Sequence, residues 1–457
     1  MEWLYIALGL AGFMVVFAFV ELYLIYRIRL LLRVMLSDHY KDNIYGMIHS
    51  MQRAGVENIV ELSLRSERGK ALKRPLGTAR KLPDFSGLAF DQPNLAVPIT
   101  PVDTTMDMKV TIGPRAKRPL TLDIPLLIGG MGYGVAVSFK TKIAWAKGAS
   151  AVGTATNTGE GAYLPEERQA AAKLIVQLSR TGWMPIDAVR QADAVEIQIG
   201  QGASGATGHE APEWKLRGRV TREWGIRRRE NVINHSHLFW QGQPWVLRDL
   251  VPEVRRLAPH IPVGVKIGAG CISLERDLEI ILENDVDFIT IDGMNAATSG
   301  EYPILEDDFG LPTILALLRA IKFFNETGVR GRVSLIISGG LLAPGDCLKA
   351  IALGADAVGM GTGPLFAAAH DQGLIALPWE PIGAVNWYVD PLSKRLKISK
   401  AAKYVENFLK ATTLEMEDGL RAIGKTSLKQ LTVADLRSIT VEAYQLTGIT
   451  PAFEWVR

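Results

Sequence analysis

Short runs of apolar residues alternate along most of the chain with longer segments in which apolar and polar residues mix at helical spacing. The apolar runs have the length of strands, and most gaps between them hold a helix-like period. Because the runs are continuous, they predict strands that are covered on both faces. They occupy residues 126–131, 151–156, 174–178, 194–200, 262–268, 288–293, 334–340 and 357–363.

Eight successive strand–helix units predict parallel pairing and a closed (β/α)8 barrel, a TIM barrel of the α/β class. An open doubly wound sheet is the alternative, since it is built from the same units. We place the barrel at residues 116–370. In such barrels the loops that follow the strands carry the chemistry, so the site is expected at the carboxyl ends of the strands.

A longer apolar segment stands near the start of the chain. Residues 3–20 are uncharged, and after Glu21 the run LYLIY extends them to a length that crosses a hydrocarbon layer of about 30 Å. Arg27, Arg29 and Arg33 follow directly, and no small-residue cleavage site closes the run. This favours a single-pass anchor, residues 1–35, with the barrel in the cytoplasm. A signal peptide or a buried core helix is the alternative.

Two further segments flank the predicted barrel, and one insertion interrupts it. Residues 36–115 are charge-mixed and then proline-rich, which predicts a membrane-proximal extension. Residues 371–457 predict a mostly helical C-terminal extension. The insertion, residues 213–245, carries seven basic residues and four tryptophans. It is a candidate lid, membrane-surface contact or partner site, or else a solvated loop whose tryptophans pack on the barrel.

Charge and cysteine content exclude several classes of protein. With 51 Lys and Arg against 48 Asp and Glu, the net charge of +3 gives no global footprint for nucleic acid. Cys271 and Cys347 are far apart, which argues against a disulfide framework or a zinc knuckle and fits a reducing compartment. His235 and His237 form a pair without a clear third ligand, so no metal is assigned.

Two glycine turns follow the last two predicted strands. Ser338-Gly339-Gly340 ends the seventh strand and Gly359-Met360-Gly361-Thr362 ends the eighth. In barrels these two loops commonly bind a phosphate, because glycine lets backbone N–H groups approach the anion and the next helix adds its dipole. An ordinary tight turn is the alternative for either one alone. Two such turns in consecutive units favour phosphate binding.

Several ordered motifs resemble the FMN-binding barrel domain of glutamate synthase in its short, stand-alone form. The resemblance runs over residues 107–369 and implies a barrel fold, FMN as the cofactor and oxidoreductase chemistry. FMN-dependent isopentenyl diphosphate isomerases have similar last-strand motifs, but NTGEGA argues against that alternative. The segments that carry the resemblance are DMKVTIGPRAKRPLTLDIPLLIGGMGYGVAVS, NTGEGAYLPEER, IQIGQGA, VKIGAG, FITIDG and ALGADAVGMGT.

The resemblance also implies a set of site residues. Lys266 is the candidate catalytic cation that stabilises charge on a reduced flavin, with a plain charge pair as the alternative. Glu160 is the candidate for holding a substrate amine or moving a proton, with a solvated glutamate as the alternative. The implied cofactor contacts are Gly130, Met131, Gly132, Asn157, Gln201, Lys266, Asp292, Gly293, Ser338, Gly339, Gly340, Gly359, Met360, Gly361 and Thr362.

The chain departs from the family's pattern where substrate binds. Gln198 stands at a position where the family has lysine, SGATGHE replaces a lysine–proline–glycine stretch, and residues 294–303 replace a glycine-rich turn. Glutamate synthesis itself is therefore in doubt. Residues 370–400 hold no cysteine, so no iron–sulfur cluster is expected.

Two functions remain open at this point. The first is a membrane-anchored FMN-dependent oxidoreductase acting on a small polar substrate, amino acid-like or imine-like. The second is a flavin-binding membrane subunit with an assembly or regulatory role and little catalysis of its own. Expected partners are the lipid bilayer, a small-molecule substrate and an unknown electron donor or partner subunit, without nucleic acid. A homo-oligomer is left open.

Overall fold

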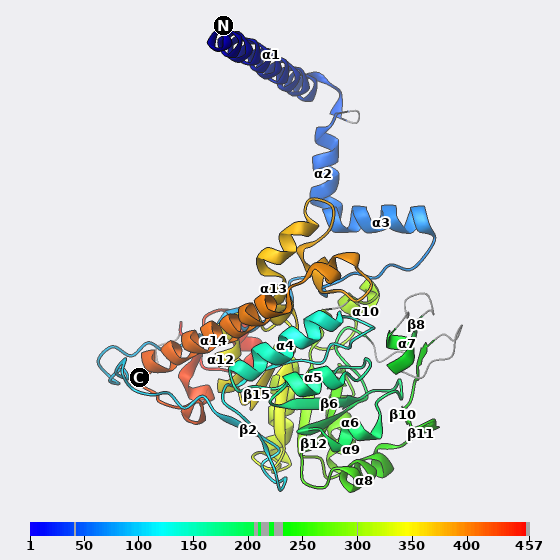
Figure 1. Ribbon diagram of the computed structural model, residues 1–457. Helices are drawn as coiled ribbons and strands as arrows, with labels where there is room; N and C mark the ends of the chain where they lie inside the picture. Colours follow the sequence, from blue (N-terminus) through cyan, green and yellow to red (C-terminus); the bar gives the residue numbers. More distant parts are fainter. Residues whose placement is uncertain (41–42, 205–208, 212–218, 224–231, 299, 454–457) are drawn as a thin grey trace. The chain divides into compact units, whose positions relative to one another are not determined.

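The computed structural model describes residues 1–457 except 41–42, 205–208, 212–218, 224–231, 299 and 454–457 (Figure 1). The chain divides into two compact units, Met1–Leu72 and Lys73–Arg457. The first unit holds helices α1 (Glu2–Ser37), α2 (Tyr45–Ala54) and α3 (Val56–Arg68). Residues 73–115, which the sequence groups with the membrane-proximal extension, belong to the second unit.

Helix α1 is apolar over most of its length, with Glu21 inside the apolar run and Arg27, Arg29 and Arg33 toward its end. Its span Trp3–Ser37 has a mean hydropathy of 2.3 in its most apolar window, and none of that window is buried within the protein. By length and composition, α1 is therefore a candidate membrane span.

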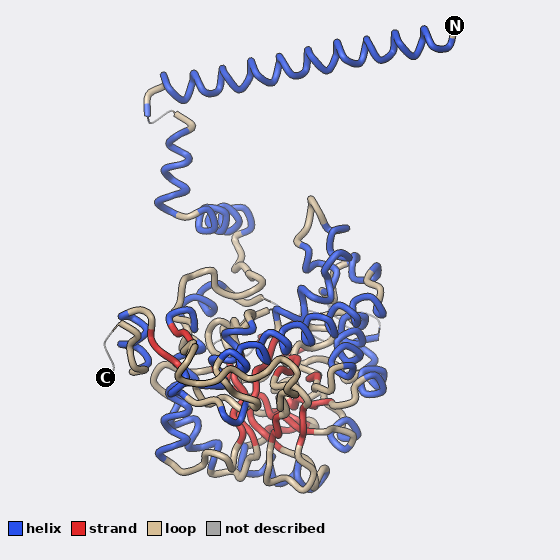
Figure 2. The backbone as a smooth tube through the Cα atoms, turned by 90° about the vertical axis from the view of Figure 1, so that its left-hand side faces the viewer, coloured by secondary structure: helices blue, strands red, loops and turns tan. Residues whose placement is uncertain are grey.

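An eight-stranded parallel sheet forms the centre of the second unit (Figure 2). The strand order is β4-β15-β14-β13-β12-β7-β6-β5, and the Ile128 N–H donates to the Ala155 carbonyl at 3.0 Å across the remaining gap. The predicted (β/α)8 barrel is thereby confirmed. Its strands are β4 (Leu126–Ile128), β5 (Thr156–Asn157), β6 (Leu174–Leu178), β7 (Ala194–Gln198), β12 (Val263–Gly268), β13 (Phe288–Asp292), β14 (Ser334–Ser338) and β15 (Ala357–Met360).

The second barrel strand is shorter and later than the sequence predicts. Residues 151–156 were expected to form it, but Ala151 ends helix α4 (Phe139–Ala151) and the strand is Thr156–Asn157. Gly153 lies at φ +68°, where glycine turns the chain out of the helix, and the Thr154 N–H still bonds the Ala149 carbonyl. This apolar stretch is therefore mostly a helix end.

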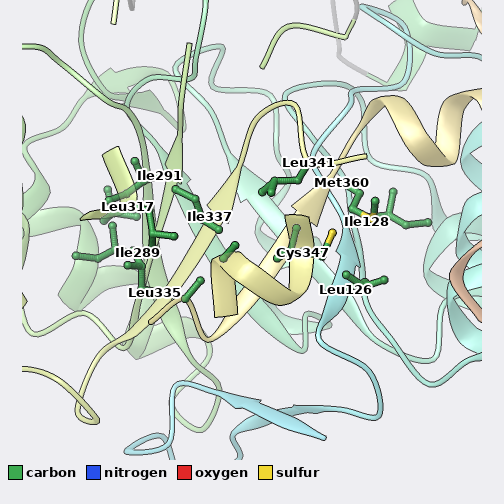
Figure 3. Packing of buried hydrophobic residues seen from close by; sticks show 14 of the residues in the cluster. Leu126, Ile128, Ile289, Ile291, Leu317, Leu335, Ile337, Leu341, Cys347 and Met360 are labelled. Carbon is green, nitrogen blue, oxygen red and sulfur yellow. The ribbon is translucent and has the colours of Figure 1, made fainter. Parts of the chain in front are cut away.

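Alternate residues of each strand point to opposite faces, which gives the barrel two apolar layers. Ile289, Ile291, Leu335 and Ile337 point outward in Figure 3 and pack toward the surrounding helices. The barrel helices and their flanking helices are α5 (Pro165–Ala170), α6 (Ile186–Arg190), α8 (Leu247–Leu257), α9 (Leu274–Leu282), α10 (Pro303–Asp308), α11 (Thr313–Glu326), α12 (Pro344–Ala352) and α13 (Thr362–Ala369).

A hairpin closes the amino-terminal end of the barrel. Strands β2 (Val110–Ile112) and β3 (Leu120–Leu122) pair antiparallel, and their apolar side chains join the inward-facing residues of the barrel strands in one buried cluster. The hairpin therefore fills the end of the barrel opposite the strand ends where the site is expected. Inward-facing members of this cluster are Leu127, Ile175, Phe288 and Ile336.

The C-terminal extension packs on the barrel and is mostly helical, as the sequence predicts. Helix α14 (Ile398–Ala422) crosses α4 so closely that a Cβ on Gly148 would lie 2.8 Å from the Val405 side chain. Strand β16 (Leu436–Ser438) pairs with β1 (Leu88–Phe90). The other elements are η4 (His370–Ala376), η5 (Ile382–Asn386), η6 (Pro391–Arg395), η7 (Leu428–Gln430), η8 (Val433–Asp435), α15 (Val441–Thr447) and, before the barrel, η2 (Phe85–Gly87).

The basic insertion lies partly outside the described residues. Its described part holds α7 (Arg219–Glu223), β9 (Val232–Asn234), β10 (Phe239–Trp240) and β11 (Gln243–Pro244), and β9 pairs with β8 (His209–Ala211). Trp240 is 1% exposed and its indole N–H donates to the Met184 carbonyl at 2.6 Å. At least this tryptophan therefore packs on the barrel.

Replacing Phe288 by alanine should lower the free energy of unfolding by about 3–5 kcal/mol, because it leaves a cavity inside the barrel. Phe288 is fully buried against Gly264 of the neighbouring strand. Denaturant unfolding of the full chain in detergent, followed by circular dichroism, measures the loss. Phe453 is 52% exposed, so Phe453→Ala should change stability by less than about 0.5 kcal/mol. Equal losses for both variants would contradict the packing.

Candidate functional site

A pocket opens at the carboxyl ends of the strands. Residues 295–298, 300 and 301 after β13 form part of its wall. Three predicted cofactor residues, Gly132, Asn157 and Gly293, are not part of the lining. The other twelve line it: Gly130, Met131, Gln201, Lys266, Asp292, Ser338, Gly339, Gly340, Gly359, Met360, Gly361 and Thr362.

The two glycine turns lie side by side because β14 and β15 pair in parallel with Ser338 opposite Gly359. Gly339 and Gly340 have φ of +118° and +70°, a region in which a residue with a side chain is strained. Within the described part of the chain, the backbone N–H groups of Gly339, Gly340 and Gly361 donate to no protein acceptor. The start of α13 at Thr362 adds a positive helix end. These groups together form a cradle for an anion.

The loop after β13 lies against the two glycine turns that form this cradle. The hydroxyl oxygens of Thr298 and Thr362 lie 3.1 Å apart, and the Asn295 side chain accepts a hydrogen bond from the Thr313 N–H at 3.0 Å. Ala297 adopts φ +90°, an unusual conformation for a residue with a Cβ. The loop is therefore held in one strained arrangement above the glycine turns.

A strap at the start of the second unit, residues 73–80, holds the far end of this loop. The Arg74 N–H donates to the Glu301 carbonyl at 2.9 Å, and its guanidinium pairs with Glu306 at 2.9 Å and Asp307 at 2.5 Å. Burial lowers the pKa of Arg74, but the two carboxylates outweigh burial and raise it. The Thr78 hydroxyl also bonds Asp307, at 2.6 Å. A segment far away in sequence thus fixes this loop.

Lys266 and Asp292 form a buried ion pair at the mouth of the barrel. The ammonium lies 2.9 Å from the Asp292 carboxylate, and their side chains are 8% and 6% exposed. Burial lowers the pKa of Lys266, but the negative charges of Asp292 and Glu196 outweigh burial and raise it above its usual value. The pocket wall therefore carries a permanent positive charge with a paired negative charge.

Glu196 lies one layer deeper in the barrel and was missed in the sequence reasoning. Glu196 is 2% exposed. Its carboxylate accepts hydrogen bonds from Asn157 and Gln177 at 2.8 Å and from Thr290 at 2.6 Å. The signal was present in the strand AVEIQIG, where Glu196 and Gln198 are spaced by two. That spacing puts both on one face of a strand, here the inside of the barrel.

Glu160 lies beside the pocket, near several positively charged side chains. Burial of its carboxyl group raises its pKa, and the nearby cations Arg180, Lys266 and Lys73 together with a hydrogen bond from Gln198 only partly oppose that effect. Gln198 also donates to the Gln201 side chain at 2.9 Å. Arg180, which is 7% exposed, was missed in the sequence reasoning although it lies two residues after the strand 174–178.

The loop that carries Glu160 is supported from behind by a buried ion pair. Lys142 on α4 lies 2.9 Å from Glu167, and its ammonium donates to the Asn157 carbonyl at 2.6 Å. Both side chains are at most 1% exposed. The same loop also lies close to the turn after β4, because a Cβ on Gly132 would lie 2.3 Å from the Gly161 nitrogen. Asn157 and Gly132 therefore position this loop and do not face the pocket.

Gly293, the third predicted contact outside the pocket, has a packing role. Its N–H donates to the Ser338 carbonyl at 2.9 Å, and a Cβ there would lie 2.2 Å from the Thr313 hydroxyl. The departure from the family pattern in SGATGHE falls largely on residues 205–208, which lie outside the described residues.

Comparison with known proteins gives one consistent result. The family model for the conserved region in glutamate synthase matches residues 94–426. A glutamate synthase large subunit-like protein of Rhizobium meliloti (strain 1021) is 33% identical over 401 residues, covering 82% of this chain and 89% of that protein. An archaeal-type glutamate synthase (NADPH) of Dehalococcoides mccartyi is 28% identical over 428 residues, with coverages of 87% and 84%. A putative lactate oxidase of Pediococcus acidilactici shares the fold, with a TM-score of 0.52 and 14% identity over 78% of this chain and 84% of that one.

Glu160→Gln should remove the pH-dependent contribution that Glu160 makes to the free energy of unfolding. Because the pKa of Glu160 is raised in the folded state, the folded chain binds this proton more tightly than the unfolded chain, whose value is near 4.5. The free energy of unfolding of the natural protein, relative to Glu160→Gln, should therefore fall as the pH rises above about 4.5. Denaturant unfolding at a series of pH values measures the difference.

Glu166→Gln is the matched control for that series. Glu166 bonds Arg219 at 2.7 Å, and this hydrogen bond lowers the pKa of its carboxyl group. Stability relative to Glu166→Gln should therefore rise with pH, and only slightly, because the pair is partly exposed. A Glu160 series that is flat or that rises with pH would show that its carboxyl group is not held in its neutral form.

Proposed function

We propose that this FMN-dependent oxidoreductase, which belongs to the glutamate synthase family, acts on a small polar substrate. The substrate would be amino acid-like or imine-like and would bind in the pocket at the carboxyl ends of the strands. The observation that carries the proposal is that the two glycine turns and the Lys266–Asp292 pair line the same pocket. An anion cradle and a fixed positive charge are what a flavin nucleotide requires of a protein.

The residues of the pocket fit FMN. The N–H groups of Gly339, Gly340 and Gly361 would hold its phosphate, since they donate to no protein acceptor in the described part of the chain. A side chain would close this cradle, because a Cβ on Gly340 would lie 2.9 Å from the Asn295 Cβ. When bound, FMN supplies the capacity to take two electrons from a donor and pass them to an acceptor.

Lys266 would hold its positive charge against the flavin ring. Its ammonium stays protonated because Asp292 and Glu196 raise its pKa, and the pair with Asp292 fixes its position. A charge that is already in place needs no reorganisation when negative charge develops next to it. Lys266 therefore tunes the readiness of the cofactor to accept electrons.

Glu160 would hold or move a proton at the substrate nitrogen. Its raised pKa keeps the carboxyl group neutral to a higher pH than usual, which suits a general acid. The neighbouring cations Arg180 and Lys73 suit a substrate that carries a carboxylate. Together these groups support an amino acid or imino acid as the substrate class.

Helix α1 would anchor the protein in a membrane as a single span. Its apolar length suits the bilayer core, and Arg27, Arg29 and Arg33 in its last turns favour a cytoplasmic position for the barrel. We place the anchor at residues 1–35. Electrons would come from a soluble donor or a partner subunit, since residues 370–400 carry no cysteine for an iron–sulfur cluster.

The second candidate function is a flavin-binding subunit with an assembly or regulatory role. The observation that favours it is Gln198, a neutral residue beside Glu160 at a position where the family has lysine. Turnover separates the two functions. A flavin that is reduced by a donor and reoxidised by an amino acid precursor supports the enzyme, and a flavin that no donor reduces supports the subunit.

Gly340→Ala should weaken FMN binding by about 5- to 150-fold, because strain at positive φ costs roughly 1–3 kcal/mol in the turn that forms the cradle. The bound flavin per mole of purified protein, read from its absorbance, measures the loss. Gly345→Ala is the control, because a Cβ there meets nothing within 4 Å. Equal flavin content in the two variants would place the phosphate elsewhere.

Lys266→Gln should make the flavin harder to reduce, and Asp292→Asn should make it easier, because they remove opposite charges from one pair. We expect shifts of about 30 mV or more in opposite directions, equivalent to about 1.4 kcal/mol for two electrons. Spectroelectrochemical titration of the bound flavin measures both potentials. Shifts of the same sign, or none, would remove the electrostatic role of Lys266.

A further inference from the structure

An exposed apolar tip follows the last barrel helix. Along α13 and the turns after it, five large apolar side chains are 43–89% exposed, with Trp379 the most exposed at 89%. In Figure 1 these turns continue from α13 on the side away from the strands. A cluster of this kind is unusual on a soluble surface and marks an interaction site. The apolar tip consists of Phe366, Leu374, Ile375, Leu377 and Trp379.

The exposure of the tip is built into the fold. Gly373 and Ala376 are buried between the exposed residues, and a Cβ on Gly373 would lie 2.2 Å from the Ile382 side chain. Beneath them Asn386, fully buried, donates to the Leu365 carbonyl at 3.1 Å. The Ser138 N–H in turn donates to the Asn386 carbonyl at 2.8 Å. These buried residues therefore hold the apolar side chains of the tip at the surface.

Basic side chains flank the apolar tip. Four of them line one surface hollow, and the Lys397 N–H donates to the Gln372 side chain at 2.7 Å, which joins this hollow to the turn that carries Leu374. The Lys140 ammonium also donates to the Lys394 carbonyl at 2.5 Å. This basic rim consists of Lys140, Lys147, Lys394, Arg395 and Lys397.

Acidic residues also lie near the tip. Asp371 forms an ion pair with Lys400. Glu380, which follows Trp379, forms a hydrogen bond with Asp390, and this bond together with the charge of Asp390 raises the pKa of Glu380. The five residues of the basic rim outnumber Glu380 and Asp390, so the surface around the tip still carries a net positive charge.

These observations favour a lipid surface over a second copy of the chain as the occupant. In a two-fold dimer the same patch meets itself, so one basic rim would face another and repel it. Tryptophan and leucine beside lysine and arginine match the interface of an anionic bilayer, where the rings lie at headgroup level. If α1 spans the membrane, residues 38–72 tether the barrel near that surface, and a weak contact then suffices.

We infer that the apolar tip and the basic rim form a second membrane contact, which inserts Trp379 and its apolar neighbours into the headgroup region of an anionic bilayer. This inference rests on the membrane anchoring proposed above. It would hold the barrel in one orientation on the bilayer, so that substrate and electron donor reach the pocket from a defined side.

A fluorescent label at position 379 in the full chain tests this inference. Cys271 is exposed and is replaced by serine, whereas Cys347 is buried and burial raises the pKa of its thiol to about 12, so it does not react. An environment-sensitive dye is attached to Trp379→Cys. The matched control is Ile272→Cys, because Ile272 is 94% exposed elsewhere on the barrel. Both proteins are reconstituted into phosphatidylcholine vesicles with or without about one-third phosphatidylglycerol.

Flotation of the vesicles reports the anchor, and quenching by lipid-attached quenchers reports the tip. We expect both proteins to float, the label at 379 to be quenched at least about twofold more than the label at 272, and the difference to grow with phosphatidylglycerol. Floating protein with equal quenching at both positions would overturn the tip contact and leave the anchor standing. Protein that does not float would overturn both.

Two further outcomes are decisive. A label at 379 that is already shielded in lipid-free detergent, more so at higher protein concentration, would identify a protein contact and overturn the inference.

Leu374→Ser combined with Trp379→Ser should keep bound flavin and flotation while abolishing the quenching of a label at Leu377→Cys. If quenching at that position persists unchanged, the apolar residues do not make the contact.

Discussion

The parallel pairing of β14 with β15 is the interaction on which the candidate site depends. Because Ser338 lies opposite Gly359, the two glycine turns leave the sheet at the same level and their N–H groups point into one pocket. A shift of this register by one residue would turn the side chains of a whole strand to the other face. Close packing on both faces opposes such a shift, because the shift would exchange the side chains that fill the barrel interior with those that pack against the helices.

The barrel interior is ordered by polarity from its closed end to its open end. Apolar side chains and the β2–β3 hairpin fill the closed end, neutral donors surround Glu196 in the middle, and the Lys266–Asp292 pair stands at the mouth. A buried charge is tolerated only where partners compensate its lost hydration. The carboxylates below and beside Lys266 therefore explain how a charged lysine persists there, and Lys142–Glu167 serves the adjoining loop in the same way.

Segments outside the barrel shape the site as much as the strands do. The strap at residues 73–80 ties down the loop after β13, through Arg74 and its two carboxylate partners. Helix α14 covers α4, from which Lys142 reaches the loop of Glu160. These contacts join segments that are hundreds of residues apart, so the pocket exists only once the whole second unit has folded.

The sequence by itself determined the class of fold and most of the pocket. Continuous apolar runs predicted all eight strands, with an error only where the end of α4 reads like a strand, and the glycine turns predicted two of the loops that line the pocket. Local period and glycine content are properties of short segments, so they are readable without a structure. Tertiary structure alone decided which side chains meet. It put Glu196 beneath Lys266, brought Arg180 and Lys73 to Glu160, turned Asn157, Gly132 and Gly293 away from the pocket, and left Trp379 on the surface, because long-range packing sets side-chain burial and contacts.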